Sequence, residues 1–214
     1  MKKTLLTILL VAPFILNAQV IITMAGNGTA GFSGDDGSAT AAELDQPSTV
    51  YTNGGNLFIY DNNRIRKVSA DGIINTICGN GIAGYSGDGS QAYYAEIEVA
   101  YDFTTDSIGN LYFADVGNNC IREIDTAGII NTVVGTGAGG YSGDGGHADS
   151  AELNEPTGIV FDEKGNLYIC DYLNHRIRKV DTAGIITTIA GTGIAGFSPD
   201  GSLADTAMLN GGVI

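Results

Sequence analysis

The sequence predicts an all-β fold, a β-propeller built from four-stranded antiparallel blades. A block of glycine, an aromatic residue, serine and aspartate recurs along the chain at spacings of 53, 56 and 56 residues. Each period contains four short segments rich in Ile, Val, Leu, Tyr and Phe, which Gly, Asn and Asp residues separate. Four strands in a period of roughly 40 to 60 residues are typical of propeller blades.

Four sequence blocks recur in the same order and account for residues 20–214. The first spans 31–37, 84–89, 140–145 and 196–201; the second 55–61, 109–115 and 165–171; the third 64–68, 120–124 and 176–180; the fourth 72–77, 128–133 and 184–189. The chain has 32 glycines in 214 residues, which is about twice the usual share of roughly 7%. They follow no Gly-X-Y period, so they are interpreted as turn residues.

The third period shows how the strands are assigned. Strands are predicted at 157–161, 166–170, 176–180 and 185–190, with a tight turn at 162–166. The glycine-rich connections between periods contain a short stretch at 39–44, repeated at 148–153, that is compatible with a single helical turn. No long helix is expected.

The repeat units run over about 20–72, 73–128 and 129–184, followed by a partial unit at 185–214. Residues 20–25 are a lone copy of the fourth block and supply one outer strand, whereas the sequence stops at 212–214, where a fourth inner strand would begin. The expected architecture is therefore an incomplete arc of three blades plus an N-terminal outer strand. We interpret the sequence as a gene fragment truncated at its C-terminus; the alternative is a three-blade unit that completes a ring by self-association.

Residues 1–19 have the pattern of a secretory signal peptide. Lys2 and Lys3 precede an apolar run from 5 to 16, which is shorter than the roughly 20 residues that a membrane-spanning helix needs. No other segment is long enough to span a membrane. The mature protein is therefore predicted to be secreted, extracellular or at the cell surface, with the periplasm as a further option.

The negative net charge argues against nucleic acid as a partner. The chain has 10 basic and 24 acidic residues and a net charge of -14, and loss of the two leader lysines makes the mature chain more acidic. Nucleic-acid binding needs surplus Lys and Arg to neutralise phosphates, so it is not expected.

The second, third and fourth blocks resemble NHL repeats. The residues that carry the resemblance are Gly-Asn-Leu-Tyr-Ile-Cys-Asp at 165–171, Asn-His-Arg-Ile-Arg-Lys-Val at 174–180 and Gly-Ile-Ile-Thr-Thr-Ile at 184–189. The form is similar to the long glycine-rich repeats of secreted bacterial proteins and to the teneurin NHL propeller. This resemblance implies a six-bladed, TolB-like propeller. Cys120 departs from the pattern, since Arg64 and Arg176 stand at the equivalent positions.

Propeller topology predicts a distinct acidic face. The connector from an outer strand to the next inner strand and the turn between second and third strands emerge on the same side of a blade. The connectors, at 26–47, 79–100, 135–156 and 191–214, contain no Lys or Arg. They contain thirteen acidic residues: Asp35, Asp36, Glu43, Asp45, Asp88, Glu96, Glu98, Asp144, Asp149, Glu152, Glu155, Asp200 and Asp205. A face of one sign favours cations or basic partners; the alternative is that these acids only keep the protein soluble.

Three sequence patterns could indicate a metal or cofactor site. The G-x-G-x-x-G motif at 26–31 recurs in every connector without a following long helix, so it is interpreted as loop architecture and no cofactor is predicted. The candidate Ca²⁺ ligands are Asp35, Asp88, Asp144 and Asp200, although they fit turn-bracing roles better. His147 and His175 alone are too few for a catalytic zinc. The cysteines Cys78, Cys120 and Cys170 are expected to be small buried or half-buried strand residues.

Seven of the eight mature basic residues fall in third-strand copies, so Asp61, Asp115 and Asp171 are expected to pair with arginines across the hairpin. The predicted function is a secreted, non-catalytic binding scaffold for a protein or carbohydrate ligand, with a basic partner favoured. The alternatives are a calcium- or metal-dependent hydrolase or lyase of the six-bladed type and a structural cell-surface adhesin. The candidate ligand-face residues are Tyr85, Asp88, Tyr141, Asp144, Asn118 and His175.

Overall fold

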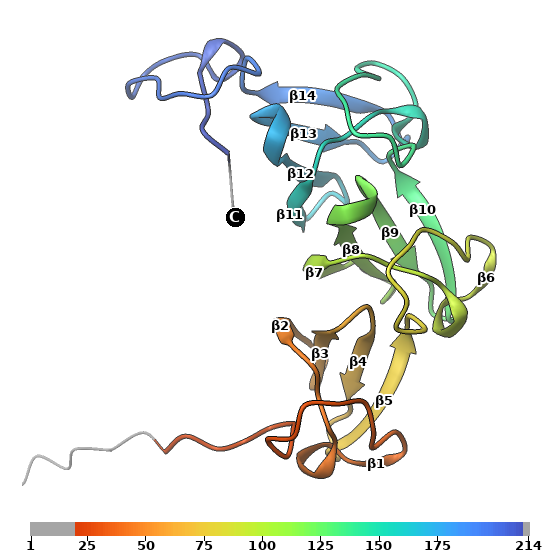
Figure 1. Cartoon of the computed structure of the whole chain (residues 1–214). Coiled ribbons are helices and arrows are strands. Elements are labelled where there is room, and N and C mark those ends of the chain that lie inside the picture. Colours follow the sequence, from red (N-terminus) through yellow and green to blue (C-terminus); the bar gives the residue numbers. More distant parts are fainter. Residues whose placement is uncertain (1–19, 212–214) are drawn as a thin grey trace, which may run out of the picture.

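Three antiparallel sheets form an open arc in a computed structural model that describes residues 20–211 (Figure 1). The strands of the first blade are β2 (Pro47–Asn53), β3 (Asn56–Asp61), β4 (Ile65–Val68) and β5 (Ile73–Cys78). Those of the second are β7 (Ala100–Thr105), β8 (Leu111–Asp115), β9 (Cys120–Ile124) and β10 (Ile129–Val134). Those of the third are β11 (Pro156–Phe161), β12 (Leu167–Asp171), β13 (Arg176–Val180) and β14 (Ile186–Ala190). The predicted blade arc is confirmed, and the inner strands β2, β7 and β11 line its concave side.

The first two sheets have a fifth strand that the sequence did not predict. The order is β1-β5-β4-β3-β2 in the first sheet and β6-β10-β9-β8-β7 in the second. Strands β1 (Gly37–Ser38) and β6 (Ser90–Gln91) belong to connectors, and Gly37 and Ser38 pair with Ile74 and Ile73 of β5. Each connector therefore crosses one end of the blade that follows it, folds over the outer edge of that blade and returns to its inner strand.

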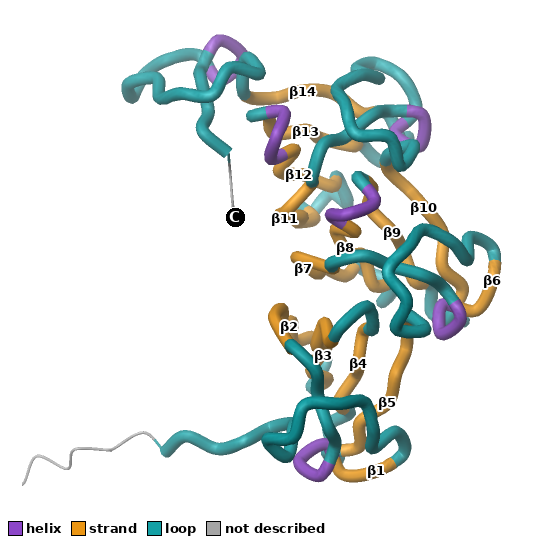
Figure 2. Tube along the Cα trace, in the orientation of Figure 1, coloured by secondary structure: helices purple, strands orange, loops and turns teal. Residues whose placement is uncertain are grey.

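Single helical turns occur only in loops within residues 20–211 (Figure 2). Four lie in the connectors, at Ala39–Ala41, Ala92–Tyr94, Ala148–Ser150 and Ala204–Thr206, and two lie between second and third strands, at Val116–Asn118 and Tyr172–Asn174. The predicted turns at 39–44 and 148–153 are confirmed.

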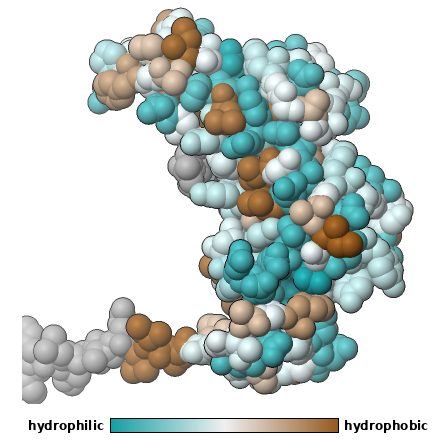
Figure 3. All heavy atoms as spheres, in the orientation of Figure 1, coloured by the Kyte–Doolittle hydropathy of each residue, from teal (hydrophilic) through white to brown (hydrophobic). Residues whose placement is uncertain are grey.

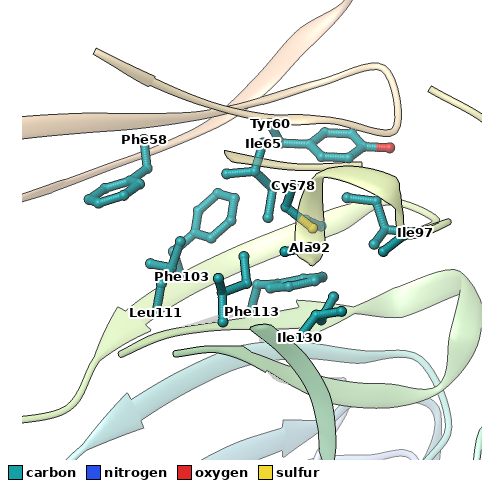
Figure 4. Close-up of a cluster of buried hydrophobic side chains, with 13 residues drawn as sticks. Phe58, Tyr60, Ile65, Cys78, Ala92, Ile97, Phe103, Leu111, Phe113 and Ile130 are labelled. Carbon is teal, nitrogen blue, oxygen red and sulfur yellow. The ribbon is translucent and has the colours of Figure 1, made fainter. Parts of the chain in front are cut away.

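The hydrophobic core lies between neighbouring blades. One cluster joins the first and second blades and includes Phe58, Phe103, Leu111 and Phe113 (Figure 4). A second cluster joins the second and third blades through residues such as Ile169. The three cysteines are buried, at 0 to 1% exposure, as predicted. Stacking of blades thus buries apolar faces that no single blade could bury alone.

Residues 20–25 do not form the predicted N-terminal outer strand, and this prediction is corrected. Residues 20–24 form no strand, and the side chains of Val20, Ile21 and Ile22 are 70 to 98% exposed, visible as the apolar group beyond the first blade in Figure 3. A strand needs a neighbour for its backbone hydrogen bonds, and no described segment pairs with this one. The predicted signal peptide at 1–19 lies outside the described residues.

Candidate functional site

Parts of the connectors lie beside the turns between second and third strands, as predicted, although the connectors also fold over the outer edges of the blades. The Asn118 side-chain amide donates to the Gly84 carbonyl at 2.8 Å, and the Asn174 amide donates to the Gly140 carbonyl at 2.6 Å. These bonds join each turn to the connector of its own blade. We call the surface formed by 26–47, 79–100, 135–156 and 191–211, together with these turns, the connector face.

A buried arginine ties each of the first three connectors to the blade that follows it. Arg122 is fully buried, and its Nη2 donates to Asp88 Oδ1 at 2.8 Å and to the Ser86 carbonyl at 3.0 Å. Its Nη1 donates to Asp115 Oδ2 at 3.4 Å, so the predicted cross-hairpin pair is confirmed. We call this arrangement the connector latch. Its other copies are Arg66 with Ser33, Asp35 and Asp61, and Arg178 with Ser142, Asp144 and Asp171.

The inner aspartate of each latch also holds the far end of the connector. Asp115 Oδ1 accepts the backbone N–H of Glu98 at 2.8 Å and the Asn118 amide at 3.0 Å. In the third blade Asp171 accepts the N–H of Asn154 at 2.8 Å. One charged pair therefore anchors a connector both near its middle and just before the inner strand.

An aromatic ring covers each latch. The Arg122 guanidinium carbon lies 5.0 Å from the centre of the Tyr85 ring, and the equivalent distance from Arg178 to Tyr141 is 4.9 Å. The hydroxyl of Tyr85 bonds to Thr132 Oγ1 at 2.9 Å. Both tyrosines keep 41 to 44% of their surface exposed, so these two predicted ligand-face residues do reach solvent.

Two further candidate ligand-face residues, Asn118 and His175, make contacts within the protein. Asn118 is buried, with 8% exposure, and is engaged by Asp115 and Gly84, so its assignment to a ligand-accessible face is a correction. His175 is half-buried in left-handed backbone with φ of 51°, and its Nδ1 accepts the N–H of Gly211 at 3.2 Å. It braces a connector.

Three of the four candidate metal ligands are engaged in ion pairs, whereas Asp200 forms none within the described residues. Asp35, Asp88 and Asp144 each bind a buried arginine at 2.8 to 2.9 Å, which is the opposite electrostatic environment from one that collects Ca²⁺. Hydrogen bonds from Thr188 and Tyr141 and the charge of Arg178 outweigh partial burial and lower the pKa of Asp144. Within residues 20–211 no group of three or more His, Cys, Asp or Glu side chains is arranged to hold a metal ion. These three aspartates therefore neutralise buried arginines in addition to bracing turns.

Most connector acids remain without a cation. In the described part of the chain, ion pairs involve Asp35, Asp88 and Asp144 but none of the other ten connector acids. Three of the ten, Glu43, Glu96 and Glu152, occupy the same position in successive units, where each carboxylate lies over a glycine; a Cβ at Gly84 would meet Glu96 Oε2 at 2.7 Å. We call Glu43, Glu96 and Glu152 the glutamate row.

Burial raises the pKa of Asp115 to about 6, against the opposing hydrogen bonds from Asn118, Glu98 and Arg122. Because the folded-state pKa exceeds the ordinary value of 3.8, this group contributes most stability below pH 4, and that contribution is lost as pH rises through 6. We expect carbon NMR of the Asp115 carboxyl group to show a midpoint near pH 6. A midpoint below 4 would contradict the dominance of burial.

No helix within the described residues is long and apolar enough to cross a membrane.

Comparison with known proteins identifies the repeats. Residues 138–208 match the family model described as the teneurin NHL domain. Teneurin-1 of Caenorhabditis elegans is 35% identical over 163 residues, covering 73% of this chain and 6% of that protein. Teneurin-1 of Gallus gallus is 32% identical over 188 residues, covering 81% of this chain and 7% of that protein. The chain thus matches only a small part of the length of these relatives.

The fold has a counterpart among solved structures. The crystal structure of an auxiliary nutrient binding protein from Bacteroides ovatus superposes with a TM-score of 0.59 and 20% identity, covering 79% of this chain and 42% of that one. At this identity the likeness concerns the fold. With its in-phase sequence blocks and four-stranded blades, the chain is an NHL-repeat β-propeller protein, similar over its matched length to the NHL domain of teneurins.

Proposed function

We propose that the chain is a secreted, non-catalytic interaction module whose connector face binds a protein partner with a basic surface. The observation that carries this proposal is the glutamate row, with its repeated carboxylates that form no ion pair in residues 20–211. The similarity to a teneurin NHL domain and the leader-like residues 1–19 support an extracellular interaction role.

The latches make the connector face suitable for recognition. Each of the first three connectors is a long segment with little regular secondary structure, yet its middle and its end are both bonded to a buried ion pair. A surface held in one conformation loses less conformational entropy when a partner binds. The excess of negative charge steers a basic partner toward this face and sets its orientation.

The test compares two pairs of charges. An immobilised lysine-rich decapeptide serves as the basic probe, and its affinity is measured at increasing salt for the chain and for the Glu96→Gln/Glu152→Gln variant. We expect the variant to bind about three- to tenfold more weakly near 0.15 M salt, corresponding to roughly 0.3 to 0.7 kcal/mol for each charge removed. Binding should weaken as salt rises.

The matched control is Asp71→Asn/Glu163→Gln, which removes two exposed charges from hairpin turns at the other end of the blades. Its affinity should stay within about twofold of the unmodified chain. Equal losses in both variants would show an effect of net charge alone and overturn the proposed face. Binding should persist with EDTA, whereas loss on chelation would favour the metal-dependent alternative.

A further inference from the structure

A pocket opens between the first and second blades. Its volume is about 450 Å³, and the residues that matter here are Phe58, Lys67, Gln91, Tyr93, Leu111 and Asp125. They come from the two blades and from the connector that folds over the outer edge of the second blade. We call it the Tyr93 pocket.

The inner end of the pocket is rigid and apolar. Phe58 and Leu111 belong to the inter-blade cluster, and Figure 4 shows them at one end of it, facing each other from neighbouring blades. Phe58 is 8% exposed and Leu111 is 4% exposed. The packed core therefore keeps the pocket floor in place without a ligand.

Polar groups around the pocket have unused hydrogen-bonding capacity. Within residues 20–211, the Lys67 ammonium forms no ion pair, and the Gln91 side-chain amide forms no hydrogen bond. Asp125 uses Oδ1 to accept the N–H groups of Ala127 and Ile129, at 2.8 and 2.9 Å, while Oδ2 forms no such bond. The pocket thus offers donors from Lys67 and Gln91 and acceptors from Gln91 and Asp125.

Two adjacent tyrosines, of which Tyr93 lines the pocket, break the repeat. Tyr93 lines the pocket with 44% of its surface exposed, and Tyr94 is 71% exposed. Their rings meet edge to face at 5.2 Å between centroids. The equivalent positions in the other connectors are Thr-Ala at 40–41, Asp-Ser at 149–150 and Asp-Thr at 205–206. Framework packing does not require aromatic residues there.

We propose that the Tyr93 pocket binds a neutral saccharide, one pyranose ring stacking on Tyr93 while its hydroxyls bond to Lys67, Gln91 and Asp125. Lys67 and Asp125 together leave the pocket without a net charge, so it presents no field of one sign that would select an anion or a cation. An apolar ligand would bury these polar groups without partners. A polyol with an apolar ring face satisfies both the aromatic and the polar parts. Gln91 and Tyr93 belong to the connector at 79–100, but the pocket contains no member of the glutamate row, so this proposal does not depend on the connector-face proposal.

The junction of the second and third blades provides an internal control. Its equivalent pocket measures about 460 Å³, but Asp149 replaces Tyr93 and His147 replaces Gln91. This second pocket lacks an exposed aromatic ring from the connector. It should not bind neutral saccharides with comparable affinity.

The experiment titrates the chain with cellotriose, maltotriose, mannotriose and chitotriose by calorimetry and ligand-observed NMR, with choline and citrate as charged comparators. At least one trisaccharide should bind, and Tyr93→Ala should weaken it at least tenfold, as expected for loss of an aromatic contact surface. Gln91→Ala should weaken binding about three- to tenfold, whereas Asp149→Ala in the equivalent pocket should leave it unchanged.

Because Tyr93 and Gln91 are exposed, these variants should unfold within about 2 °C of the unmodified chain. Absence of binding by all four trisaccharides would overturn the proposal. So would binding that survives Tyr93→Ala, or binding of choline or citrate that is tighter than that of every trisaccharide.

Discussion

Replacement of Arg122 by methionine is expected to lower the free energy of unfolding by about 3 to 5 kcal/mol, the range typical of breaking a buried ion pair by removing one partner. The guanidinium is fully buried, and its loss leaves Asp115, which is also 0% exposed, without its cation. The Ser86 carbonyl loses its donor in the same step. Urea unfolding near pH 7, with the slope compared between variants, measures the change.

A double-mutant cycle identifies the cause. Arg122→Met/Asp115→Leu removes both charges, so it should be less destabilising than the sum of the two single replacements. Additive losses would show that the two residues act independently. A loss below about 1 kcal/mol for Arg122→Met would contradict the latch as a major contributor to stability.

Replacement of Phe113 by alanine is expected to lower the free energy of unfolding by about 3 to 5 kcal/mol, because the truncation leaves a cavity between the first two blades. Phe113 is 0% exposed, and its ring lies 6.4 Å from that of Phe103. Backbone amides in the first two blades should also exchange hydrogen faster than those of the third blade.

The control for this core replacement is Ile108→Ala in a hairpin turn, where the side chain is 74% exposed. Its effect should stay within about 0.5 kcal/mol. If Phe113→Ala accelerated exchange equally in all three blades, the chain would unfold as one cooperative unit rather than losing one inter-blade contact first.

The repeat predicts contacts that are local in the chain. Asp115 and Arg122 are diagonal neighbours across a single hairpin, with Cys120 opposite Asp115 and Phe113 opposite Arg122, so their pairing follows from strand order and the alternation of side chains. The pair between Asp88 and Arg122 spans 34 residues and depends on the path of the connector over the outer edge of the blade. Periodicity shows that both residues recur, but it does not give that path.

The sequence also does not show which polar residues are buried. Asn118 is a turn residue by its sequence neighbours, and only its three-dimensional packing against Gly84 and Asp115 shows that it is inaccessible. Residues 20–24 have a strand-like composition, yet no described strand provides their hydrogen-bond partners. The Tyr93 pocket arises from two blades and a connector, so no single sequence block indicates it.

The connector latch has a consequence for how such chains change in evolution. Every latch joins a connector to the blade that immediately follows it in the chain, and the buried arginines at 66, 122 and 178 are 56 residues apart. Duplication or deletion of one 56-residue unit therefore moves a complete ion-pair network with its own partners. Neighbouring units need only compatible apolar faces, so gene segments of this type are suited to gain or lose repeats without redesign of their buried charges.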